Sequence, residues 1–259
     1  MIHSLYIHLP FCLRRCSYCD FYSQTDLSLK GAYIHALEKD ALFFKPFCGE
    51  IKTLYIGGGT PSVFSVKEFS SLFDILRGHF RFSKNCETTV EVNPRSATKE
   101  LLSFLRENGV NRLSIGIQFM DTKLLLKARR NHSPEDAEKI FHAARKAGFK
   151  NINTDIIYGF PGQDEETFSN TLKRITALSP EHISAYIYTP PSGRKNILKE
   201  TPPENEITAS MYGTLCRELN KAGFLHYEIS NFARPGKKSL HNLNYWKRRS
   251  YAGFGAAAV

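Results

Sequence analysis

Short apolar runs alternate along the chain with longer segments in which apolar residues recur at helical spacing. The strand-like runs are Ser4–Leu9, Thr53–Ile56, Thr88–Val92, Arg112–Ile117, Asn151–Ile157 and His182–Tyr188. The helix-like segments are Leu29–Phe44, Val66–Gly78, Thr98–Asn108, Pro134–Ala147 and Glu165–Leu178. The runs are too short for helices and alternate too little for half-exposed strands, so they predict buried strands. Strands that alternate with helices predict an α/β fold with a parallel sheet and right-handed crossovers.

Three of these units share one sequence feature, a glycine between the end of a helix-like segment and a strand-like run. The glycines are Gly109, Gly148 and Gly223, and each can take the left-handed conformation that ends a helix. Ser133 and Pro134 predict the cap and the first residue of a helix. Six such units would form a partial barrel, and a flavodoxin-like open sheet is the alternative.

The alternation of strand-like and helix-like segments ends near residue 190, where prolines and a glycine predict a loop before a helix over Glu204–Lys221. We therefore predict a barrel over residues 1–190 and a short C-terminal α+β extension over 191–259. The chain stops in the small-residue run Gly255–Val259, which we interpret as a truncation.

The composition indicates where in the cell the protein works but does not identify a partner. The 259 residues are 42% hydrophobic and 23% charged, which is typical of a globular protein. No apolar run approaches the ~20 residues of a membrane span. No secretion signal opens the chain, and the six cysteines lack a paired framework, so we expect a cytoplasmic protein. The net charge of +10 favours a solvated surface first and an anionic ligand second, and we expect no nucleic-acid partner.

The candidate chemistry lies just after the first predicted strand, where Cys12, Cys16 and Cys19 form a CxxxCxxC motif. Ligand sites of parallel α/β folds are built at this edge of the sheet. Three close thiolates suit a soft metal centre. Ordinary iron–sulfur clusters take four cysteines, so three would leave one iron open to another ligand. The alternative is a zinc knuckle completed by His8 or Asp20, although zinc sites usually draw on two separated pairs.

The spacing, with Tyr18 just before the last cysteine, resembles the radical S-adenosylmethionine superfamily. The resemblance implies a partial (β/α)6 barrel of the TIM-like type and a 4Fe-4S cluster on the three cysteines. It also implies that S-adenosylmethionine binds the open iron, and that reduction of the cluster splits it to a deoxyadenosyl radical.

Further loops carry polar groups at the ends of later strands. Consecutive glycines at Gly57–Gly59 let backbone approach a ligand closely, and Glu91 could accept hydrogen bonds from a ribose diol. Asp155 interrupts an apolar strand, so it must face a polar site or a partner, for which Arg130 is the candidate.

These segments, in this order, resemble the branch that contains anaerobic coproporphyrinogen oxidase and the HemW-type haem chaperones. The resemblance implies that Tyr18 packs by the adenine and leaves open whether one or two S-adenosylmethionine molecules bind. The contacts to S-adenosylmethionine that it implies are Tyr6, Gly58, Gly59, Thr60, Glu91, Gln118, Arg130 and Asp155.

Two features favour the chaperone side of that branch. The oxidase pattern has a cysteine two positions past the triplet, where this chain has Phe21. The stretch from His241 to Trp246 resembles the HNxxYW signature of the haem chaperones. His241 could ligate haem iron, with Tyr245 and Trp246 packed on the porphyrin, or these residues could simply plug the barrel.

We therefore expect a haem chaperone that passes haem to an acceptor, such as a respiratory protein. The alternatives are an oxygen-independent coproporphyrinogen III oxidase, which decarboxylates its substrate to protoporphyrinogen IX, and a zinc-stabilised binding domain.

Overall fold

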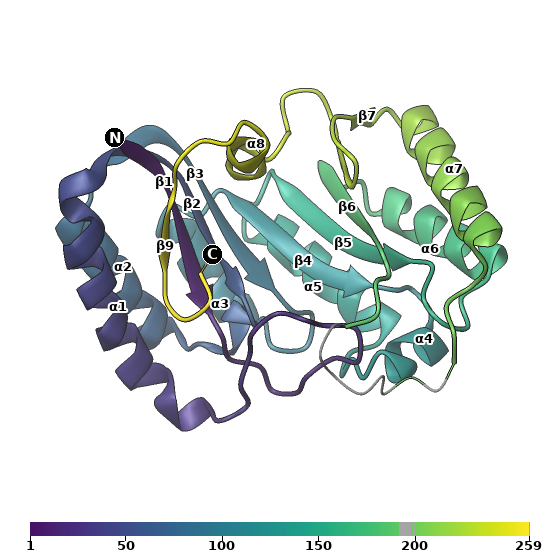
Figure 1. The fold of residues 1–259 in the computed structure, drawn as a ribbon, viewed down its shortest axis with the longest axis horizontal. Coiled ribbons are helices and arrows are strands. Elements are labelled where there is room, and N and C mark those ends of the chain that lie inside the picture. The colour runs from purple at the N-terminus through teal and green to yellow at the C-terminus, as the bar shows by residue number, and fades with distance from the viewer. Residues whose placement is uncertain (192–197, 199, 259) are drawn as a thin grey trace.

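The fold is a curved sheet with helices on its outer side (Figure 1). The computed structural model describes residues 1–191, 198 and 200–258. The sheet has nine strands in the order β7-β8-β6-β5-β4-β3-β2-β1-β9. Its central strands, all parallel, are β1 (Ile2–Leu9), β2 (Cys48–Gly58), β3 (Phe82–Val92), β4 (Arg112–Gln118), β5 (Ile152–Tyr158) and β6 (His182–Ile187).

The helices that connect these strands follow the predicted segments closely, except for α4, which the sequence analysis did not predict. They are α1 (Lys30–Phe44), α2 (Val66–His79), α3 (Lys99–Glu107), α4 (Thr122–Lys127), α5 (Pro134–Lys146) and α6 (Glu165–Ala177), with 3-10 turns at Leu27–Leu29, Lys45–Phe47 and Pro61–Val63. Ser133 caps α5 as predicted, in a capping box with Asp136. Gly109, Gly148 and Gly223 have φ of 87°, 93° and 83°, which confirms them as left-handed helix stops.

Consecutive strand order from β1 to β6 excludes the flavodoxin-like alternative, in which the order would reverse. The predicted partial barrel is confirmed, and it does not close. After α7 (Asn205–Lys221), β7 (Leu225–His226) and β8 (Asn231–Ala233) extend the edge beside β6 with antiparallel pairing. After α8 (Leu240–Trp246), β9 (Ala252–Phe254) pairs with β1 at the other edge.

The C-terminal extension therefore contributes strands to both edges of the barrel sheet. The domain boundary near residue 190 stays a prediction, and the segment 192–197 that follows it lies outside the described residues.

The two faces of the sheet differ in polarity. Side chains that point outward, such as Leu5, Ile7 and Ile56, form the apolar core against the helices. Inward positions carry polar side chains: Asn153 donates to Ser114 at 2.7 Å, whereas Thr89 Oγ1 and Arg112 Nε have no hydrogen-bond partner within the described residues. Polar groups on this face are therefore available to a ligand. Within the part of the chain that the structure describes, no helix has the length and apolarity needed to cross a membrane.

Candidate cofactor site at the carboxyl ends of the strands

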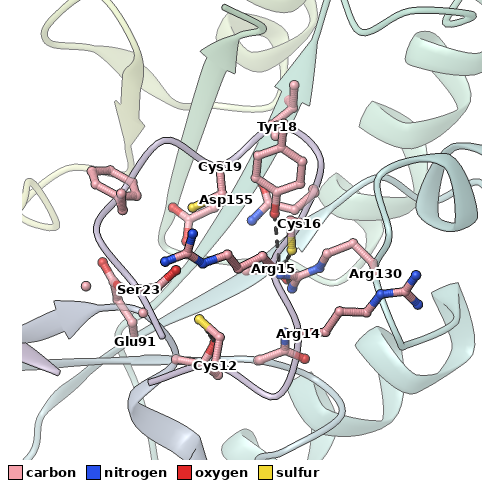
Figure 2. Close-up of a pocket in the computed structure, with 18 of the residues that line it drawn as sticks. Cys12, Arg14, Arg15, Cys16, Tyr18, Cys19, Ser23, Glu91, Arg130 and Asp155 are labelled. Atoms are coloured by element: carbon pink, nitrogen blue, oxygen red, sulfur yellow. Dashed lines mark hydrogen bonds between the residues drawn. The ribbon is translucent and has the colours of Figure 1, made fainter. Parts of the chain in front are cut away.

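A cavity of about 610 Å³ lies at the carboxyl ends of the parallel strands (Figure 2). All the predicted cluster and S-adenosylmethionine residues except Tyr6 line it. They are Cys12, Cys16, Tyr18, Cys19, Gly58, Gly59, Thr60, Glu91, Gln118, Arg130 and Asp155. These residues come from the strands β2 to β5 and from the loops that follow β1, β2 and α4, so segments far apart in the sequence share one pocket at the common edge of the parallel sheet.

The loop that carries the cysteines is closed at its base by backbone hydrogen bonds. Cys12 N–H donates to Gln24 O at 2.9 Å, and Gln24 N–H donates to Pro10 O at 2.7 Å. Ser17 fastens the tip of the loop to the end of α4, since its N–H donates to Ala128 O at 3.1 Å. These bonds hold the three thiols over the barrel mouth.

The thiols face the cavity beside hydrogen-bond donors (Figure 2). Thr60 Oγ1 donates to Cys12 Sγ at 3.3 Å, and Arg130 Nη1 contacts Cys16 Sγ at 3.7 Å. Burial raises the pKa of the Cys12 thiol, while the Thr60 hydroxyl acts in the opposite direction. Donors and a cation beside soft thiolates fit an iron–sulfur cluster, whose sulfur atoms are stabilised in this way.

The glycine loop after β2 is pinned against the cysteine loop. Gly59 N–H donates to Leu9 O at 2.9 Å, and Thr60 N–H donates to Phe11 O at 2.8 Å. A Cβ added at Gly59 would lie 2.8 Å from the Phe11 backbone nitrogen, so only glycine allows this approach. Gly58 has φ of 105°, which also favours glycine. The backbone is thus brought to the pocket wall without side chains in the way.

Glu91 ends β3 with its carboxylate held by Tyr55, whose hydroxyl donates to Oε1 at 2.7 Å. Gly57 makes room for it, since a Cβ there would lie 2.9 Å from the carboxyl group. Burial, followed by the negative charge of Asp155, raises the pKa of Glu91 to about 7. A carboxyl group poised near neutrality and lining the pocket is suited to accepting hydrogen bonds from a ligand.

Asp155 lies on the inner face of β5, within a hydrogen-bond network. Ser114 Oγ donates to Oδ2 at 2.9 Å, and Asn153 Nδ2 donates to Oδ1 at 2.7 Å. Burial raises the pKa of Asp155, and the hydrogen bonds and the positive charge of Arg112 oppose that rise. Arg112 is 1% exposed, and its charge also lowers the pKa of Glu91. A buried cation thus offsets two carboxylates in the barrel.

Arg130 does not pair with Asp155 as the sequence had suggested; its partners lie toward the cysteine loop. Its guanidinium contacts Cys16, reaches the Tyr18 hydroxyl at 3.4 Å, and donates to the Gly116 carbonyl. Gln118 ends β4 with φ of 68°, an uncommon conformation for a residue with a side chain. Strain of this kind is typical of positions fixed by function.

Several lining residues were not predicted from the sequence. Tyr55, Ser114, Tyr186 and Tyr188 line the same cavity. Tyr55 and Ser114 lie two residues before Gly57 and Gly116, so strand alternation from those glycines could have placed them inside the barrel.

The predicted haem residues lie at the opposite end of the barrel, where α8 covers the amino ends of the strands (Figure 1). His241 is fully buried, with Nδ1 2.8 Å from Thr53 Oγ1 and Nε2 2.9 Å from the Tyr245 hydroxyl. The backbone N–H of His241 donates to Glu87 Oε1 at 3.0 Å, and burial lowers the pKa of the imidazole to about 3. Trp246 is 55% exposed. Both ring nitrogens of His241 are engaged, which fits the barrel plug considered above; haem ligation by His241 stays a prediction.

A smaller cavity of about 300 Å³ lies beside α8. Its lining residues are Tyr6, Tyr55, Tyr186, His241, Asn242, Tyr245 and Tyr251. Tyr6 points here, with its hydroxyl 3.0 Å from His8 Nδ1, so the structure does not bring it to the cluster pocket.

The architecture and the motifs match known proteins over nearly the whole chain. The family model of the radical SAM superfamily matches residues 6–175. The heme chaperone HemW of Bacillus subtilis (strain 168) is 37% identical over 98% of this chain and 70% of that protein. The heme chaperone HemW of Escherichia coli (strain K12) is 33% identical over 98% and 69%.

Among solved structures, the Escherichia coli coproporphyrinogen III oxidase HemN, a radical SAM enzyme, is similar with a TM-score of 0.85 and 29% identity. The similarity covers 97% of this chain, which spans 60% of the length of that one. The chain therefore belongs to the radical SAM superfamily and, within it, to the family of the heme chaperone HemW proteins.

Proposed function

We propose that this protein is a haem chaperone that binds haem and transfers it to an acceptor protein. The observation that carries the proposal is the similarity to proteins named heme chaperone HemW over 98% of the chain. Phe21 supports it, because the oxidase pattern has a cysteine at this position.

In this proposal, Cys12, Cys16 and Cys19 hold a 4Fe-4S cluster whose open iron supplies a binding position for S-adenosylmethionine. The three thiols line one cavity together with the hydroxyl of Thr60 and the guanidinium of Arg130. We rank the cluster above the zinc-stabilised domain because structural zinc sites usually draw on two separated pairs of ligands, whereas the other cysteines, Cys48, Cys86 and Cys216, are scattered singly along the sequence.

The other pocket residues would orient S-adenosylmethionine. The backbone of Gly58 and Gly59 forms the pocket wall at the methionine end, and Glu91 accepts hydrogen bonds from the ribose hydroxyls. Tyr18 packs by the adenine. Gln118, Arg130 and Asp155 form a second polar group along the same wall, which would hold the same molecule or a second one.

The second candidate is an oxygen-independent coproporphyrinogen III oxidase. The TM-score of 0.85 with the solved oxidase favours it, since the pocket architecture is shared at the level of the fold. A shared fold does not carry a shared reaction, and the residue at Phe21 speaks against the oxidase.

The two functions separate in one experiment on protein purified without oxygen after iron–sulfur reconstitution. Haem and coproporphyrinogen are titrated separately, with S-adenosylmethionine and a reductant present. The chaperone proposal predicts a shifted Soret band with haem and no protoporphyrinogen from coproporphyrinogen. Absence of a Soret shift together with protoporphyrinogen formation would discard the chaperone in favour of the oxidase.

A further inference from the structure

Several large apolar side chains are exposed to solvent around the rim of the cluster pocket. Phe21 is 67% exposed, Leu13 51% and Ile187 53%, and all three line the cavity together with Tyr186, which is 43% exposed. Single exposed apolar residues are ordinary, but several gathered around one cavity mark a binding surface.

The same rim carries arginines. Arg14 and Arg15 belong to the cysteine loop, Arg129 follows α4, and all three are exposed and line the cavity. Figure 2 shows the side chains of Arg14 and Arg15 extending in opposite directions from their loop. None of the three forms an ion pair with a carboxylate of the described residues. Asp20 is the exposed acid of this rim, and Glu91 and Asp155 lie less exposed along the cavity wall.

A rim with exposed apolar side chains and exposed guanidinium groups has the chemistry that recognises a flat apolar dianion. Arginine pairs with carboxylates through two parallel hydrogen bonds, and an exposed aromatic ring offers a face on which a macrocycle can stack. Haem has an apolar macrocycle with two propionates on one side. The α8 end offers less, because His241 is buried with both ring nitrogens engaged.

We propose that haem binds across the mouth of the cluster pocket, with its macrocycle on Phe21 and its propionates paired with arginines of the rim, which are Arg14, Arg15 and Arg129. This inference rests on the proposed chaperone function and names the place where that function is carried out. It puts the cargo over the cluster, at the opposite end of the barrel from α8 (Figure 1).

The test compares haem with haem dimethyl ester, which keeps the iron and the macrocycle but lacks the propionate charges. Both are titrated into cluster-reconstituted protein without oxygen, and the Soret band reports binding. Up to two partly exposed ion pairs predict that Arg14→Ala/Arg15→Ala weakens haem binding about 2- to 30-fold and reduces the preference for haem over its ester. Loss of the stacking face predicts a decrease of about tenfold for Phe21→Ala, with recovery in Phe21→Trp.

The chain provides matched controls away from the pocket. Phe43→Ala removes a phenylalanine of α1 that is 66% exposed, and Arg248→Ala/Arg249→Ala removes two exposed charges next to α8. We expect both controls to bind haem with wild-type affinity. If the cysteine-loop variants lose their iron, Arg129→Ala, outside that loop, keeps the arginine part of the test independent of the cluster.

Each outcome decides one claim. Wild-type protein that binds no haem overturns the chaperone function, and the mouth site falls with it. Haem binding that is unchanged in the Phe21 and arginine variants but lost in His241→Ala overturns the mouth site alone. Equal affinity for haem and its ester in the wild type also overturns the role of the arginines.

Discussion

Replacing Glu91 by glutamine removes a buried charge while keeping the shape of the side chain. The fold raises the pKa of Glu91 from 4.5 to about 7, chiefly by burial. In the unfolded chain the carboxyl group loses its proton near its ordinary pKa, whereas the folded protein retains the proton up to about pH 7. Stability therefore falls as pH rises between these two values and is level above the higher one.

The magnitude follows from the two pKa values. At about 1.4 kcal/mol for each pH unit, the difference sets an upper limit of ~3 kcal/mol. Glu91 lines a cavity that water can enter, so screening reduces this figure, and we expect ~1–3 kcal/mol. Glu91→Gln should thus be more stable than the wild type by this amount at pH 8 and no more stable at pH 4.5.

Glu91→Gln should raise the stability of the protein at pH 8 but lower its affinity for S-adenosylmethionine. A carboxylate that accepts hydrogen bonds from the ribose contributes about 1.5–3 kcal/mol, so Glu91→Gln should bind S-adenosylmethionine roughly ten- to hundredfold more weakly at pH 8. Wild-type affinity should also decrease as pH falls below about 7, as Glu91 takes up its proton.

The assays are urea unfolding between pH 4.5 and 8 and calorimetric titration with S-adenosylmethionine, both on reconstituted protein without oxygen. Glu107→Gln, at the exposed end of α3, is the matched control and should change neither quantity. If Glu91→Gln is destabilised at pH 8, or binds S-adenosylmethionine as tightly as the wild type, the reasoning about this carboxylate is wrong.

Three further changes test other parts of the site. Gly59→Ala places a Cβ against the Phe11 backbone, so the loop must move and we expect less iron per protein after reconstitution; wild-type iron content would contradict this. Arg130→Ala removes a cation beside Cys16, and we expect the cluster absorbance to decay faster in air, whereas an unchanged decay rate would exclude this role. His241→Ala removes a fully buried ring together with its hydrogen bonds to the hydroxyls of Thr53 and Tyr245, so urea unfolding should show a loss of about 2–4 kcal/mol; a change below 1 kcal/mol would argue against the plug.

The sequence predicted the pocket well because a parallel sheet brings its loops to one edge. Cys12 and Gly59 follow β1 and β2, and Glu91 and Asp155 lie within β3 and β5, yet all of them line one cavity. Helix boundaries were also predictable wherever a local residue sets them, as Ser133 does for α5.

Local sequence patterns could not predict how segments far apart in the sequence pack against one another. Arg130 lies beside Cys16 and not beside Asp155, because the turn after α4 directs it toward the cysteine loop. Tyr6 alternates onto the inner face of β1 but lies nearer the far cavity. The place of His241 at the amino ends of the strands depends on how α8 docks against Glu87, which no spacing in the sequence records.

The central claim is that three cysteines hold a four-iron cluster with one open iron. Mössbauer spectroscopy of protein reconstituted with isotope-enriched iron, before and after S-adenosylmethionine, tests it most directly. The account predicts a 4Fe-4S spectrum in which one iron changes when S-adenosylmethionine is added, and loss of that spectrum in Cys12→Ala. Protein that contains zinc in place of iron, or a cluster whose Mössbauer spectrum does not change when S-adenosylmethionine is added, would contradict it.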